Sequence, residues 1–72
     1  MRYAKAIMNC NEAIKIESKS IRAYLYRGAI KFNIKAYALA IKDLTQAISM
    51  DPTCALAYFN RAVCFQERKV HQ

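Results

Sequence analysis

The amino-acid sequence predicts an all-α protein built from a repeated pair of helices. Apolar residues recur at intervals of three and four, the spacing of one helix face. The 72 residues include only one Gly and one Pro, while 56% are hydrophobic, which favours helices joined by short turns over disorder. The sequence also matches itself after a shift of 34 residues, the separation of Tyr3 and Tyr37.

The first helix is expected to run from Arg2 to Ile16. Ser18 and Ser20 then interrupt the pattern, and Ser20 is a good N-cap for the helix that follows. One face of the first helix is apolar at helical spacing: Tyr3, Ala6, Ile7, Cys10, Ala13 and Ile14.

The second helix is expected from Ile21 to Ile34, with Lys35 and Ala36 in the turn after it. The third is expected from Tyr37 to Met50. Asp51 should end that helix, because the residue before Pro52 disfavours helical dihedral angles.

The fourth helix is expected from Cys54 to Arg68. Thr53 is the candidate N-cap, since a threonine hydroxyl can accept a hydrogen bond from a free backbone amide. The last residues, 69–72, are expected to fray.

The internal repeat extends over three separate blocks of sequence. Residues 3–7 match residues 37–41, residues 11–14 match 45–48, and residues 23–28 match 57–62. A repeat of this length is typical of two-helix units whose stacked copies share one continuous core.

The segment of residues 21–54 has aromatic residues at Tyr24 and Tyr37, small residues at Gly28, Ala40 and Ala47, and Pro52 near its end. With these residues it resembles one complete tetratricopeptide repeat (TPR). The resemblance implies a helix-turn-helix repeat solenoid, here with four helices in B-A-B-A order. Lys35 departs from the family pattern by replacing the turn Gly, and Arg27 and Lys31 stand where apolar residues are common. Lys31 is expected to lay its stem along the core and its charge in water. The aromatic, small and Pro positions that match the family are Tyr24, Gly28, Tyr37, Ala40, Ala47, Pro52, Tyr58 and Ala62.

In this interpretation residues 1–20 are the second helix of a partial repeat, residues 21–54 are a complete repeat, and residues 55–72 are the first helix of a following repeat. The two outer helices should therefore lack part of their cover. The chain is then expected to be a piece of a longer array or, alternatively or in addition, a unit that self-associates head-to-tail through its first and fourth helices. The small and apolar side chains expected to lose cover are Ala6, Cys10, Ala13, Ala62 and Phe65.

The resemblance implies a protein-protein interaction scaffold with a concave groove for a peptide or helix of a partner protein. Leu25, Phe32 and Phe59 have a competing interpretation as residues that pack between repeats. The candidate groove residues are Arg22, Leu25, Ala29, Phe32, Asn33, Phe59, Asn60, Val63 and Gln66, with Leu56 beside them.

A more specific possibility within this family is a clamp for the carboxylates of an acidic peptide end. Asn60 stands at one clamp position, but Leu25 and Ala29 stand where Lys and Asn are required. The clamp is therefore incomplete, and Asn60 has the alternative role of a hydrogen-bonding residue between helices.

Catalysis, a cofactor and a metal site are not expected. The five acidic residues are dispersed, the only His is His71, and no Gly-rich phosphate loop is present. Cys10, Cys54 and Cys64 lack the paired spacing of a zinc site and are interpreted as buried small apolar residues of a reducing, cytoplasmic compartment. The alternative is an intermolecular disulfide from Cys54, which falls in a turn.

The formal net charge of +7 raises the alternatives of nucleic acid, a membrane surface and an acidic peptide. The basic residues are spread along the helices rather than clustered, which makes nucleic acid an unlikely partner and leaves RNA binding as a minor alternative. Uncharged stretches are far shorter than the roughly 20 residues that span a bilayer, so no membrane segment is expected.

Overall fold

The computed structural model describes the backbone of residues 2–71 and the side chains of residues 3–70. Within this range the chain forms four helices and no strand: α1 (Arg2–Ile16), α2 (Ile21–Asn33), α3 (Tyr37–Met50) and α4 (Ala55–His71). The prediction of an all-α protein with four helices is confirmed. No helix among these residues is both long and apolar enough to cross a membrane.

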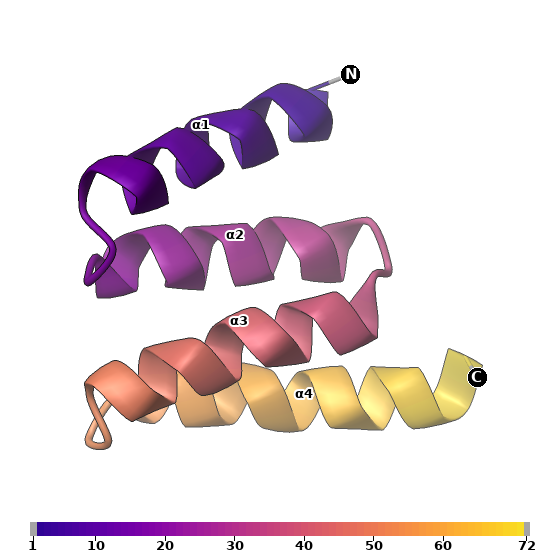
Figure 1. The fold of residues 1–72 in the computed structure, drawn as a ribbon. Coiled ribbons are helices and arrows are strands. Elements are labelled where there is room, and N and C mark those ends of the chain that lie inside the picture. The colour runs from indigo at the N-terminus through magenta and orange to yellow at the C-terminus, as the bar shows by residue number, and fades with distance from the viewer. Residues whose placement is uncertain (1, 72) are drawn as a thin grey trace.

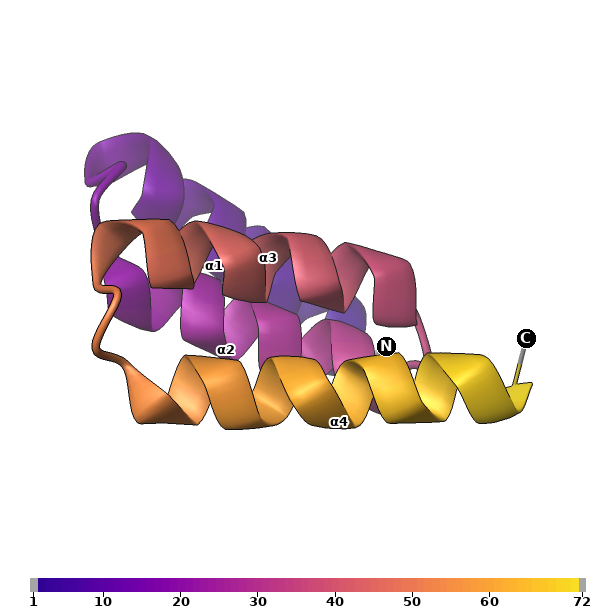
Figure 2. The same ribbon diagram turned by 90° about the horizontal axis from the view of Figure 1, so that it is seen from below.

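Consecutive helices run antiparallel and pack side by side in a flat arrangement of 36 × 33 × 13 Å (Figure 1). α2 lies between α1 and α3, and α3 packs in turn against α4. α2 also touches α4 directly, so α3 covers one side of both (Figure 2). Within the described residues, α1 approaches only α2.

The first and third turns contain hydrogen bonds that involve polar side chains. The predicted N-cap is confirmed, because Ser20 Oγ accepts a hydrogen bond of 3.3 Å from the Ala23 amide. α3 ends where expected, with Asp51 in an extended conformation before Pro52.

Thr53 does not cap α4, contrary to the prediction. Its amide and its hydroxyl both donate to Asp51 Oδ1, at 3.0 and 2.6 Å. The threonine therefore stabilises the turn between α3 and α4 by bonding to the residue that ends α3. These bonds lower the pKa of Asp51, first through the hydroxyl and then through the amide. The amides of Ala57 and Tyr58, in the first turn of α4, donate instead to the backbone carbonyl of Cys54.

The turn between α2 and α3 has the hydrogen bonding of a Schellman motif. The Ala36 amide donates to the Lys31 carbonyl at 2.8 Å, and the Lys35 amide donates to the Phe32 carbonyl at 2.9 Å. Lys35 has a φ of 66°, the left-handed conformation that this motif requires. α2 therefore ends at Asn33, one residue earlier than predicted, with Ile34 as its C-cap.

α4 continues to His71 rather than ending at Arg68. The residues beyond Arg68 contain neither Gly nor Pro, and the positive charges of Arg68 and Lys69 interact favourably with the carbonyl end of a helix. The backbone of residues 69–71, where fraying was expected, is helical in the structure, and Gln72 lies outside the described residues.

The core lies between α2, α3 and α4. Its centre is formed by Ala40, Leu44 and Cys64, which are 0–1% exposed, with Leu25 and Phe32 packed against them. Burial raises the pKa of the Cys64 thiol, because the charged thiolate is costly in an apolar environment. Short side chains make this close approach possible: Ala40 and Ala47 are fully buried, and Gly28 is buried beside Leu44.

Candidate functional site

An open hollow of about 390 Å³ lies between α2 and α4. It is mainly apolar, with a guanidinium and a side-chain amide among its lining groups. The side chains that line it are Ile21, Arg22, Leu25, Tyr26 and Ala29 from α2, and Leu56 and Asn60 from α4.

Four of the predicted groove residues meet at this hollow: Arg22, Leu25, Ala29 and Asn60. Leu56 joins them with 57% of its surface exposed. The other five predicted residues, Phe32, Asn33, Phe59, Val63 and Gln66, do not line it.

Two of the predicted groove residues also have a packing role. Leu25 and Phe32 lie against the buried cluster of Ala40, Leu44 and Cys64. Phe32 also makes an edge-to-face contact with Tyr37, with 5.5 Å between the ring centroids. The packing interpretation is therefore favoured for Phe32, whereas Leu25 contributes to both the core and the hollow.

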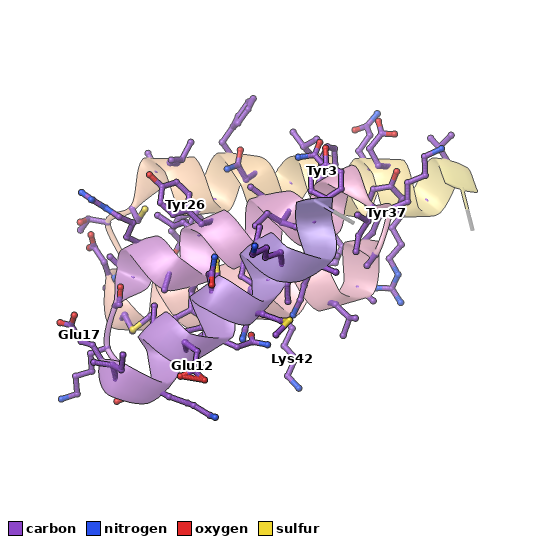
Figure 3. All side chains as sticks on the ribbon, turned by 90° about the horizontal axis from the view of Figure 1, so that it is seen from above. Tyr3, Glu12, Glu17, Tyr26, Tyr37 and Lys42 are labelled. Carbon is purple, nitrogen blue, oxygen red and sulfur yellow. The ribbon has the colours of Figure 1, made fainter. Side chains whose placement is uncertain are left out.

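Tyr26 is a lining residue that the sequence analysis did not include in the groove. It lies on α2 and is 59% exposed (Figure 3). The available signal was helical spacing, since Arg22, Tyr26 and Ala29 lie three or four residues apart and so share one face of α2.

A buried ionic cluster ties α2 to α3 on another face. Asp43 is 3% exposed and receives two hydrogen bonds from Arg27, Nε to Oδ2 at 2.9 Å and Nη2 to Oδ1 at 2.7 Å. Lys31 Nζ lies 3.1 Å from Asp43 Oδ2. The Lys31 charge is therefore paired with a buried carboxylate and not placed in water as predicted.

The cluster extends to α1 through the same guanidinium. Arg27 Nη1 donates to Asn11 Oδ1 at 2.6 Å, and its Cζ atom lies 5.3 Å from the Tyr24 ring centroid. The hydrogen bond to Asp43 is the main reason that the pKa of Arg27 is raised above its usual value. The Asp43 carboxylate and the Asn11 side-chain oxygen thus both accept hydrogen bonds from Arg27. The arrangement has the form of a structural ion pair.

Contacts of the same kind recur 34 residues later. Arg61 Nη1 donates to Thr45 Oγ1 at 3.2 Å, just as Arg27 donates to Asn11, and Arg61 lies 5.5 Å from the Tyr58 ring centroid. The structural contacts therefore follow the register of the sequence repeat.

The described residues contain no group of three or more His, Cys, Asp or Glu side chains that could hold a metal ion. The three cysteines are free thiols on separate segments.

No protein-family model matches the sequence, and no solved structure matches it significantly.

Proposed function

We propose that this chain is a helical-repeat module of the tetratricopeptide type that binds a short segment of a partner protein in the hollow between α2 and α4. The observation that carries the proposal is the meeting of Arg22, Leu25, Ala29 and Asn60 in one mainly apolar hollow. The recurrence of equivalent contacts at Arg27 and Arg61 supports the repeat assignment.

The lining favours a peptide that inserts one bulky apolar side chain. Leu25, Ala29 and the exposed Leu56 offer apolar contact, and desolvated anchors of this kind supply most of the affinity in small interfaces. Within the described contacts the Asn60 side-chain amide has no hydrogen-bond partner, so it is available to the peptide backbone.

The charge of the lining favours an acidic neighbour next to that anchor. Arg22 is exposed at the hollow and has no acidic partner among the described residues, and the formal net charge is +7. A carboxylate beside the apolar anchor would therefore gain a charge-assisted hydrogen bond and faster association.

The three free thiols fit a reducing compartment, and the proposal accordingly assigns the chain to the cytoplasm. A thiol count on protein isolated from cells with the thiols trapped at lysis tests this assignment. Recovery of an oxidised chain would contradict it.

The binding proposal is tested by NMR titration with a peptide of alternating Leu and Asp. The amide signals of Ala29, Leu56 and Asn60 should shift, and those of Gln46 and Ser49, which line a separate hollow beside α3, should not. A peptide of alternating Ser and Asp keeps the charge and lacks the anchor, so it should leave the signals in place.

Leu56→Ala should weaken binding of the Leu-Asp peptide by more than about 1 kcal/mol, because it removes an apolar wall of the hollow. Leu39→Ala is the matched control, since Leu39 on α3 is 53% exposed against 57% for Leu56. Equal responses to both peptides, spread over the basic residues, would show general charge attraction and refute the proposal.

A further inference from the structure

Among residues 2–71, one face of α1 and one face of α4 have no partner helix. The equivalent faces of α3 and α2 pack against each other in the middle of the chain. Where α2 packs on α3, Gly28 is buried against Leu44 and Ala40, which are 1% and 0% exposed. At the equivalent positions 34 residues away, Ala62 on α4 is exposed, and Cys10 and Ala6 on α1 are only half-buried. α4 thus has a face equivalent to the face of α2 that packs on α3, and α1 has a face equivalent to the face of α3 that packs on α2.

We propose that α4 of one copy docks onto α1 of a second copy of this chain, in the geometry in which α2 packs on α3. The inference goes beyond the peptide-binding function, because it assigns a different partner and a second hollow, which shares only Arg22 and Tyr26 with the peptide hollow. Three independent features of the two faces argue for a second copy as the occupant.

The first feature is a matched exchange of side-chain size. Inside the chain, a Cβ atom added to Gly28 would lie only 3.2 Å from Cγ of Leu44, so a methyl group there would require the Leu44 side chain to shift slightly. At the proposed junction the extra methyl group of Ala62 faces Cys10, which is smaller than Leu44. The larger residue on α4 therefore meets the smaller residue on α1.

The second feature is a matched exchange of charge. Inside the chain, the cations of Arg27 and Lys31 share one carboxylate, that of Asp43. At the junction the equivalent residues are Arg61, the uncharged Phe65 and the uncharged amide Asn9. The loss of the acid is thus accompanied by the loss of one cation, and the Asn9 carbonyl oxygen can accept a hydrogen bond from Arg61.

The third feature is a projecting side chain and a hollow that fits it. Phe59 on α4 is 67% exposed, and it is the equivalent of Leu25, which packs beside Leu56 and Asn60. Thirty-four residues earlier than Leu56 and Asn60 stand Arg22 and Tyr26. They line a second hollow of about 200 Å³ together with Asn9, Cys10, Ala13, Ser20 and Ala23.

The contact is heterologous, because each copy offers α4 to one neighbour and α1 to another. Such a contact produces open chains of molecules unless a ring closes. The net charge of +7 on every copy opposes association at low ionic strength, so added salt should strengthen it.

Sedimentation velocity from micromolar to millimolar concentration tests the proposal. The wild-type chain should form oligomers as concentration rises. Phe59→Glu removes the projecting ring and Ala13→Arg fills the hollow, so each variant alone should remain monomeric. Both positions are exposed, and circular dichroism should show unchanged helicity.

Mixing these two variants distinguishes this contact from a like-to-like one. The Ala13→Arg chain keeps an intact α4 face and the Phe59→Glu chain keeps an intact α1 face, so the mixture should form a heterodimer with one copy of each. Leu39→Glu, on an exposed site of α3, should associate as the wild-type chain does.

A cross-link locates the junction directly. The thiol introduced by Ala62→Cys should form an intermolecular disulfide with Cys10 under mild oxidation, and peptide mass spectrometry should identify that pair rather than one with Cys54. A monomeric wild-type chain at millimolar concentration, a monomeric mixture of the two variants, or a cross-link to Cys54 alone would each overturn the proposal.

Discussion

Lys35 shows how a single residue carries the geometry of a turn. Its φ of 66° places a side chain in a left-handed conformation that only Gly and, less often, Asn adopt readily. The two backbone hydrogen bonds that close α2 depend on this conformation, from the Lys35 and Ala36 amides. The residue that the family pattern would place here, Gly, is the one that the observed backbone favours.

Lys35→Gly should therefore stabilise the chain by about 1 kcal/mol, because it removes the steric conflict of Cβ in the left-handed region. The measurement is urea unfolding followed by circular dichroism. Lys35→Ala is the control, since it removes the charge and keeps Cβ, and it should leave the stability nearly unchanged. Equal stabilisation by both changes would show that the charge, and not φ, determines the cost.

At the scale of the elements, the packing of α2 on α3 combines small residues with a buried ionic cluster. Asp43 is 3% exposed and lies between Ala40 and Ala47 on the buried face of α3. Its two cationic partners, Arg27 and Lys31, lie one turn apart on α2. The buried carboxylate is paired with both cations, which is the condition under which a buried charge is tolerated.

Asp43→Asn should destabilise the chain by roughly 2–4 kcal/mol, because it leaves two partly buried cations without a counter-charge. Unfolding midpoints in urea measure the loss. The exposed pair of Lys15 and Glu12, whose side chains are 76% and 65% exposed, supplies the control. Glu12→Gln should cost less than about 1 kcal/mol. Equal effects of both changes would contradict a structural role for burial.

The helices were predictable from the sequence, and several of their partners were not. Periodicity alone located four helices, because the interval between apolar residues directly reflects the 3.6-residue turn. Ser20 and Pro52 fixed two boundaries through local chemistry. The pairing of Arg27 with Asp43 depends on how two helices rotate against each other, and a pattern within one helix does not contain that information.

The candidate groove was predictable to a similar extent. Arg22, Leu25, Ala29 and Asn60 were placed by their positions in the repeat, and they meet at one hollow. Phe59 was assigned to the same surface but is 67% exposed outside it. The direction of a side chain on α4 depends on the crossing of α2 and α4, and sequence spacing leaves that crossing undetermined.

At the scale of the whole molecule, the helices differ in how many of their side chains are buried. α3 has four buried residues and packs between α2 and α4. The described side chains of α1 include none that is buried, and α1 approaches only α2. Local opening is favoured where few apolar groups are buried, so α1 should open more readily than α3.

Hydrogen exchange measures this difference. At micromolar concentration the amides of α1 should exchange faster than those of α3, because α1 can separate from α2 without disrupting the cluster of Ala40, Leu44 and Cys64. At millimolar concentration a second copy should cover α1 and slow its exchange, since a partner that binds only the closed state stabilises that state. Ala13→Arg should remove the concentration dependence and keep the difference between the helices. Uniform exchange of α1 and α3 at low concentration would instead show that the four helices open as a single cooperative unit.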